Sequence, residues 1–240
     1  MKRALTVALL VVVAIPLLYA VAQLPQHGSP MTPPYTHISP RYLEKGPEEA
    51  GAENIVTDVI LNYRGFDTNG EVTVIFTSLA AVCAVLLGSR KGDERPAGEP
   101  SSSAVPVSDV VSFVVRLLSP LIAIFAVYVM LFGHISPGGG FQSGAILAAL
   151  VIVTTVIVGR KQAEALVPVR IRRLLQVAAP LTFFVVGVSG LFLFGDYLAY
   201  PKTEGQMWLA TAWLIVIGIG IGVGGAAVLA SIFWTMGDDS

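Results

Sequence analysis

The sequence has few charged residues and almost no cysteine. Only 13% of its 240 residues are charged, and the formal net charge is −1. With so few charges, no basic face of the kind that binds nucleic acid is visible. The single cysteine, Cys83, can form no disulfide within the chain and supplies no thiolate cluster. These absences exclude a disulfide scaffold and an iron–sulfur protein built from this chain alone.

The motifs of common enzyme sites are also missing. The sequence contains no phosphate-binding loop, no Ser, His and Asp arrangement on a strand–turn–helix, and no metal-ligand cluster. Gly138, Gly139 and Gly140 lack the spacing and the strand-to-helix setting of a dinucleotide fingerprint. We therefore expect no catalytic residue, no cofactor and no metal, and a protein that is not an enzyme in its own right.

Hydrophobic residues, in contrast, are abundant. They make up 54% of the chain, and the mean hydropathy is +0.74, beyond what a soluble domain usually carries. Because a helix of roughly 17 to 25 apolar residues spans a bilayer, we predict an all-α integral membrane protein with about six transmembrane helices. The predicted spans are Ala4 to Val21, Val72 to Leu87, Val110 to Phe132, Ser143 to Val158, Leu174 to Phe194 and Met207 to Trp234.

The distribution of positive charge predicts the orientation of these spans. Eleven of the 15 Lys and Arg residues fall on the amino-terminal side of the predicted membrane, and four fall opposite. Since positive charge near helix ends is retained in the cytoplasm, we expect both termini inside, in the inner (cytoplasmic) membrane of the cell. The first run also fits a cleavable signal peptide, because Lys2 and Arg3 precede it and Ala20-Val21-Ala22 follow.

A polar segment divides the chain into two predicted modules. Residues 90–106 are rich in Pro, Gly and Ser and are typical of a flexible cytoplasmic linker. Before it, residues 1–89 contain two spans and a long outer insertion, in which Leu24 to Gly51 is expected to be extended chain. After it, residues 107–240 contain four spans.

The end of the outer insertion predicts a short amphipathic helix. Asn54, Asp58 and Asn62 recur at four-residue spacing, opposite an apolar face. One interpretation is an interfacial helix with a solvated polar strip. The other places Asp58 in a hydrated cavity between subunits, where it would help to move cations.

A charged turn, Arg64 to Glu71, follows this helix directly. Thr68 and Glu71 have the spacing of a capping box at a helix start, and Asp67 is placed to pair with Arg64 across the turn. Charges at a membrane edge also need solvation or partners, so Arg64, Asp67 and Glu71 are candidates for an ion pathway shared with another subunit.

A second candidate site lies between the third and fourth spans. Its Pro and Gly residues cannot continue a regular helix without cost, and broken backbone at membrane depth must be buried in protein or line water. An imidazole can gain or lose a proton near neutral pH, so we expect His134 to be either a proton relay or a residue that orders a tight hairpin. The loop contains Gly133, His134, Ser136, Pro137, Gly138, Gly139, Gly140, Phe141 and Gln142.

The last span carries small residues at four-residue spacing, including Gly218 and Gly222. Such residues let another helix approach closely, either within the chain or from another subunit. Trp208 and Trp234 lie near opposite ends of the span, as membrane-interface anchors do.

The run from Gly133 to Gln142, GHISPGGGFQ, resembles the signature of the B-type component of Mrp-type multisubunit sodium/proton antiporters, the MnhB family. The resemblance extends from about Val107 to the C-terminus and implies a four-helix membrane module. The earlier phrase Arg64 to Glu71, RGFDTNGE, resembles the C-terminal part of the A-type Mrp component and the small E-type component of membrane-bound hydrogenases.

These resemblances imply an accessory subunit that helps to move sodium and/or protons within a larger complex, with other membrane subunits and the lipid bilayer as partners. The A-type piece is usually fused to a large antiporter-like body, so both an antiporter and a redox-driven respiratory or hydrogenase-type complex are consistent with the two pieces. The alternatives are a purely structural scaffold that packs and seals the transporting subunits, and an independent small transporter.

Overall fold

The computed structural model describes residues 2–89, 107–201 and 203–237. The predicted linker, residues 90–106, lies outside the described residues. The described chain is helical, and it separates into one unit of residues 1–44 and a second of residues 45–240.

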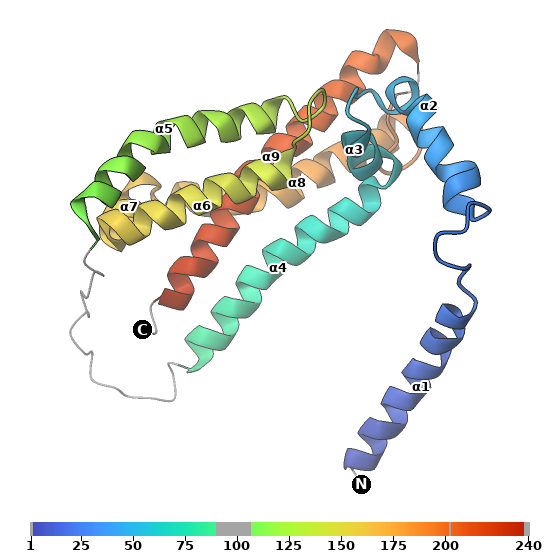
Figure 1. The fold of residues 1–240 in the computed structure, drawn as a ribbon, viewed down its shortest axis with the longest axis horizontal. Helices are drawn as coiled ribbons and strands as arrows, with labels where there is room; N and C mark the ends of the chain where they lie inside the picture. The colour runs from blue at the N-terminus through green and yellow to red at the C-terminus, as the bar shows by residue number, and fades with distance from the viewer. Residues whose placement is uncertain (1, 90–106, 202, 238–240) are drawn as a thin grey trace. The chain divides into compact units, whose positions relative to one another are not determined.

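Within the described residues, six helices are long and apolar enough to cross a membrane, as the sequence predicted. They are α1 (Lys2–Ala22), α4 (Gly65–Ser89), α5 (Asp109–Leu131), α6 (Gly140–Val158), α8 (Val169–Phe194) and α9 (Met207–Met236), of which α4 to α9 belong to the second unit (Figure 1). Helices α4 and α6 begin earlier than predicted, because their first turns contain glycines that were interpreted as turn residues. Both are therefore long enough to span a bilayer.

The first unit contains α1 and the π-helix η1 (Pro34–Ile38). Helix α2 (Ser39–Ala50) then begins, and its second half belongs to the second unit. The expectation of extended chain from Leu24 to Gly51 was wrong from Pro34 to Ala50, which η1 and α2 occupy. Pro34 and Pro40 lie in the first turns of η1 and α2, where proline is tolerated, but α2 also continues through Gly46 and Pro47.

Helix α9 is the central helix of the second unit. It packs against α6 and α8 along most of its length and also contacts α4 and α5. On one side, a Cβ on Gly140 of α6 would lie 2.5 Å from the carbonyl oxygen of Gly218, and one on Gly144 would lie 2.9 Å from that of Gly222. We call these four residues, Gly140, Gly144, Gly218 and Gly222, the glycine seam. The predicted internal contact of α9 is thus present.

The hydrophobic core joins the loop after α8 to the segment before α4. Tyr200 is 3% exposed, packs edge-on against Trp213 and donates from its hydroxyl to the Leu61 carbonyl oxygen at 2.8 Å. Burial raises the pKa of this phenol well above its usual range, so it stays a hydrogen-bond donor. The same cluster includes Phe183 and Ile217, both fully buried. This packing fixes the segment that carries the candidate site.

Candidate functional site

Two inter-helix segments that are far apart in the sequence meet at one end of the second unit. One is residues 52–58, which include α3 (Ile55–Thr57); the other is the loop of residues 132–139 between α5 and α6. We call their contact the junction. Figure 1 shows α3 close to the turn that joins α5 to α6.

Asn54 connects the two segments through its side chain. It caps α3, because its Oδ1 accepts from the Val56 amide at 3.1 Å. Its Nδ2 donates to the carbonyl oxygens of Gly133 at 2.7 Å and Ser136 at 2.9 Å. One amide side chain therefore starts a helix and holds a loop at the same time.

Further hydrogen bonds are directed at main-chain carbonyls of the same loop. Thr57 is buried and donates from Oγ1 to the Gly133 carbonyl oxygen at 2.6 Å. The amides of Glu53 and Asn54 both donate to the His134 carbonyl oxygen, at 2.9 and 3.0 Å. The loop is not helical, so its carbonyl oxygens have no amide donors from a following helical turn. These hydrogen bonds supply the missing donors.

Glycine is required in this loop by space and by backbone conformation. A Cβ on Gly133 would lie 2.7 Å from the Cα of Gly139, so the two ends of the loop touch. Gly139 has a φ of 137°, which other residues rarely adopt, and its amide donates to the Val129 carbonyl oxygen at 3.2 Å. The predicted break in the helix is therefore a closed turn on the end of α5.

Asp58 is the buried carboxylate next to the junction. Its side chain is 0% exposed, and Oδ1 accepts from the Ala52 amide at 3.1 Å. Its Oδ2 has no hydrogen-bond partner among the described residues, and a Cβ on Gly46 would lie 2.9 Å from it. Burial raises the pKa of this carboxyl from 3.8 to about 6, although the Ala52 hydrogen bond opposes the rise.

This burial corrects the expectation of a solvated polar strip. The polar side of the 54–62 helix faces protein, with Asn62 donating to the Ala50 carbonyl oxygen at 3.3 Å. On the other side, Val56 is 49% exposed. The helix itself is present, as α3 followed by the π-helix η2 (Asp58–Tyr63).

The charged turn before the second span is the first part of α4. Thr68 is buried and donates to the Ile60 carbonyl oxygen at 2.7 Å, so the predicted capping box with Glu71 was wrong. The helix begins at Gly65, and Thr68 instead ties it back to η2. The Arg64–Asp67 ion pair is confirmed, with Nε and Oδ2 2.7 Å apart, and both side chains are exposed, as is Glu71.

His134 contributes to the junction through its main chain. Its side chain is half-buried, and its Nδ1 is buried without a hydrogen-bond partner among the described residues. The carbonyl oxygen of His134 therefore takes part in the hydrogen bonds that order the tight turn, whereas its Nδ1 makes none with the described residues. The proton-relay role predicted for this imidazole stays a prediction.

The structure thus brings Asp58 and the 132–139 loop to the same end of one unit. Pro137 and Gln142 are partly or fully accessible there, and Phe141 packs against the core cluster. Sequence reasoning missed Gly46 and the roles of Asn54 and Thr57. The position of Asn54 just before an apolar run is a recognised helix-start signal and could have identified it as a cap. Among the described residues, no group of three or more His, Cys, Asp or Glu side chains is placed to hold a metal ion.

The fold and the junction define a class of protein: a multi-spanning helical membrane protein in which residues 52–58 are hydrogen-bonded to the loop between α5 and α6. A family model described as a domain related to the MnhB subunit of Na+/H+ antiporter matches residues 110–229, half of the chain. The chain belongs to this family, in agreement with the resemblance of its loop motif. A second model, described as the E-type component of MBH, matches residues 2–102.

Individual relatives agree with both matches. The chain is 27% identical over 218 residues to a probable K+/H+ antiporter component of type A/B from Rhizobium meliloti (strain 1021), covering 81% of this chain but only 22% of that protein. It is 30% identical over 135 residues to the B-type component of a Na+/H+ antiporter from Bacillus subtilis (strain 168), covering 52% of this chain and 89% of the relative.

One solved structure matches almost end to end. A chain of the membrane-bound sulfane sulfur reductase, an archaeal respiratory membrane complex, superposes with a TM-score of 0.67 at 28% identity. The match covers 98% of this chain and 97% of that chain. The arrangement of both segments in a single chain therefore has a counterpart in a solved complex.

Proposed function

We propose that this protein is an accessory membrane subunit of an Mrp-type multisubunit complex that moves sodium and/or protons across the cell membrane. Three findings support this: its membership of the MnhB-related family, the antiporter components among its relatives, and the six apolar helices. Other membrane subunits are its partners. The positive charge on one side of its helices favours the inner membrane with both termini in the cytoplasm.

We further propose that the complex to which this subunit belongs is a redox-driven respiratory assembly. The end-to-end match to a chain of a respiratory membrane complex favours it over a simple antiporter, because the A/B-type antiporter relative is several times longer than this chain. The chain then carries no redox centre and assists translocation driven elsewhere.

Asp58 is the residue to which we assign proton exchange. The observation that carries the assignment is a fully buried carboxyl with one oxygen bonded and one without a donor among the described residues. An unpaired buried carboxylate is unfavourable, so the group is readily protonated, and its pKa of about 6 places the exchange near neutral pH. Protonation at Oδ2 would also remove the unpaired charge beside the junction. His134, on the facing loop, is the second candidate on the path.

The test is ion-coupled transport by the complete complex with Asp58→Asn, which keeps the shape of the side chain and removes its titration. We expect transport to fall at least about tenfold while the complex stays assembled, as for loss of a general acid–base group. Glu53→Gln is the matched control, because it removes an exposed carboxylate only a few residues away that is not a candidate for the ion pathway. Unchanged transport in an assembled Asp58→Asn complex would contradict the assignment.

A structural scaffold is the second candidate function. It is favoured by the junction bonds, which are directed at main-chain carbonyls and need no titration. Under this alternative, Asn54→Ala would reduce the yield of assembled complex, and the complexes that do assemble would transport at the normal rate. His134→Ala separates the two functions further, because a relay role predicts slow transport by intact particles.

A further inference from the structure

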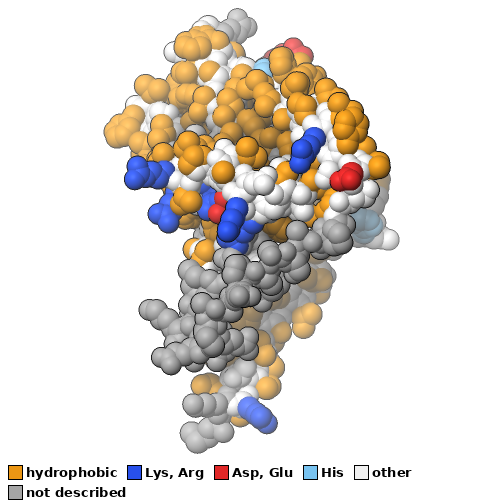
Figure 2. Space-filling model, turned by 90° about the vertical axis from the view of Figure 1, so that its left-hand side faces the viewer, with side chains coloured by type: hydrophobic (Ala, Val, Ile, Leu, Met, Phe, Trp, Pro, Cys, Tyr) orange, Lys and Arg blue, Asp and Glu red, His pale blue; other side chains and the backbone are white. Residues whose placement is uncertain are grey.

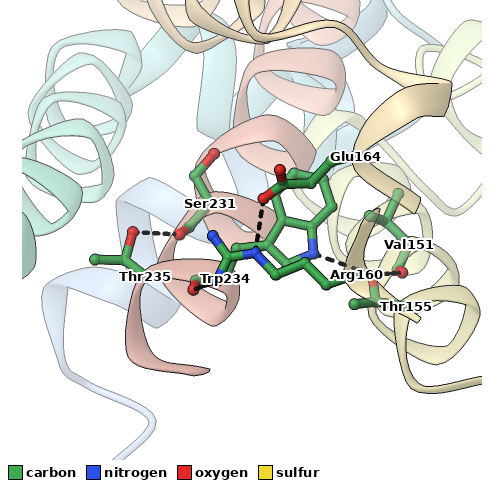
Figure 3. Close-up of polar contacts among 7 residues, drawn as sticks. All are labelled: Val151, Thr155, Arg160, Glu164, Ser231, Trp234 and Thr235. Carbon is green, nitrogen blue, oxygen red and sulfur yellow. Dashed lines mark hydrogen bonds and ion pairs between the residues drawn. The ribbon is translucent and has the colours of Figure 1, made fainter. Parts of the chain in front are cut away.

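At the end of the second unit opposite the junction, Trp234 is held in a fixed position. Its Nε1 donates to Thr155 Oγ1 at 3.1 Å, and its carbonyl oxygen accepts from Arg160 Nη1 at 2.8 Å. Figure 3 shows these groups around the indole, together with Glu164, which pairs with Arg160 at 2.8 Å. Trp234 is 3% exposed. The expectation that it is an interfacial anchor was wrong, because the indole is packed within the protein.

Arg172, near the start of α8, lies over this ring. Its guanidinium carbon is 4.6 Å from the Trp234 ring centroid, which is a favourable cation–π distance. Unlike Arg160, it is paired with no carboxylate among the described residues, and its buried Nη1 has no acceptor there. A half-buried cation with no anion among the described residues is unfavourable next to a membrane, so an added anionic group would stabilise it.

More positive charge surrounds Arg172. Arg170 and Arg173 are exposed on the same end of α8, and Lys161 is exposed on α7 (Arg160–Leu166). Figure 2, which looks at this end, shows Lys and Arg side chains among hydrophobic ones. Each such charge near a membrane surface attracts anionic headgroups.

An apolar groove begins one helical turn beyond Arg172. Gln176 lies on the same side of α8 as Arg172, donates to Ser231 Oγ at 2.6 Å and lines the groove. The groove lies between α4, α6, α8 and α9 and has a cavity volume of about 50 Å³. Its walls include Val72, Phe76, Pro180, Gly225 and Leu229.

We propose that this end of the protein binds an anionic phospholipid, with the phosphate at Arg172 and an acyl chain in the groove. The order of features along α8 carries the proposal: a cation with no anion among the described residues, one polar residue already bonded within the protein, and then an apolar groove. A phospholipid has this succession of charge and hydrocarbon, whereas free phosphate would leave the groove empty. A helix of a partner protein would need an acidic residue placed at its end to match Arg172.

The test is lipid binding by the full chain in detergent, followed by native mass spectrometry. The probes are phosphatidylglycerol and phosphatidylcholine with identical acyl chains, so that only the headgroup differs. We expect phosphatidylglycerol to bind more tightly, and Arg172→Gln to weaken it at least about fivefold, as loss of one interfacial charge predicts. Arg116→Gln is the matched control, because Arg116 is an exposed Arg of α5, and no residue of α5 lines the groove. It should leave the affinity within about twofold.

Gly225→Leu tests the acyl chain separately. A Cβ on Gly225 meets no atom within 4 Å, so the larger side chain can enter the groove without disturbing the fold. We expect it to weaken binding of long-chain phosphatidylglycerol, while inorganic phosphate at millimolar concentration displaces none. Circular dichroism melting confirms that each variant is folded.

Three results would overturn the proposal. The first is equal affinity for the two lipids. The second is a folded Arg172→Gln variant that binds phosphatidylglycerol as tightly as the wild type does. The third is displacement of the lipid by free phosphate. The last would indicate a plain anion site without a groove occupant. None of these measurements depends on transport, so the lipid site and the proposed function can fail independently.

Discussion

The junction and the glycine seam both join helices of the second unit, but they do so by different physical means. At the seam, backbones of α6 and α9 approach so closely that a single added methyl group would collide with a carbonyl oxygen. At the junction, side chains of Asn54 and Thr57 reach across to main-chain carbonyls. One contact depends on the absence of side chains, and the other depends on their hydrogen-bonding groups.

Because of this difference, we expect the seam to respond to changes in side-chain volume and the junction to respond to changes in pH. The four seam glycines contain no titratable group, so volume changes should affect the seam and pH should not. The junction has a buried carboxyl, Asp58, beside it, so it is the contact that a proton can alter. Four predictions test this division.

The largest effect is expected from Gly140→Ala. The new Cβ would lie 2.5 Å from the Gly218 carbonyl oxygen and 2.7 Å from the Ile221 Cβ, and the backbone can relieve this only by separating α6 from α9. We expect a loss of about 3 kcal/mol or more and little folded chain in detergent. Gly225→Ala is the control and should keep wild-type stability. A stable Gly140→Ala protein would show that the seam tolerates volume.

The second prediction concerns pH. Folding raises the pKa of Asp58 from 3.8 to about 6, so the folded chain holds this proton more tightly than the unfolded chain does. The contribution of Asp58 to stability is therefore greatest below pH 3.8 and declines as pH rises to about 6. Above that pH, the cumulative loss is about 3 kcal/mol.

Asp58→Asn should remove this part of the pH dependence. The measurement compares unfolding free energies of wild type and variant at a series of pH values in the same detergent. The difference between them should change between pH 3.8 and about 6 and then stay constant. A constant difference over the whole range would mean that Asp58 titrates normally in the folded chain.

The third prediction removes the junction bonds without a change of charge. Asn54→Ala deletes the α3 cap and both bonds to the loop, so we expect a loss of about 1 to 3 kcal/mol. Thr57→Val deletes one bond with little change of shape and should cost about 1 kcal/mol. Hydrogen exchange at the amide of Gly139 would report local opening of the loop. If the Gly139 amide exchanged at the wild-type rate in both variants, the junction bonds would not be what holds the loop closed.

The smallest effect is expected at the Arg64–Asp67 ion pair. Its side chains are 64% and 53% exposed, so solvent screens the attraction. Replacing either partner with a neutral amide side chain should change stability by less than about 1 kcal/mol, and added salt should reduce the difference further. A larger loss would indicate that this pair is part of the structural contact.

The sequence predicted the helices well, because a run of apolar residues long enough to cross a bilayer has few other structures available. It predicted helix starts poorly. Gly65, Gly70 and Gly140 are typical of turns, yet Gly65 and Gly140 are the first residues of α4 and α6, and Gly70 lies inside α4. At Gly140, close packing against α9 outweighs the weak helix preference of glycine.

The candidate site was only half predictable for a related reason. The spacing of Asn54 and Asp58 indicated one polar face, but a single sequence does not reveal whether such a face meets water or carbonyl groups. Those carbonyls belong to a loop 79 positions away from Asn54. The motif of that loop was recognisable from its glycines, whereas its partner segment required the three-dimensional structure.

The junction also determines which substitutions each of its two sides can accept over evolutionary time. Since the loop is recognised by its main-chain carbonyls, the side chains at Ile135 and Pro137 can change without losing one of these bonds. Asn54 and Thr57 have no such latitude, because their own amide and hydroxyl groups make the contact. A saturation library should therefore be permissive at the first pair and restrictive at the second.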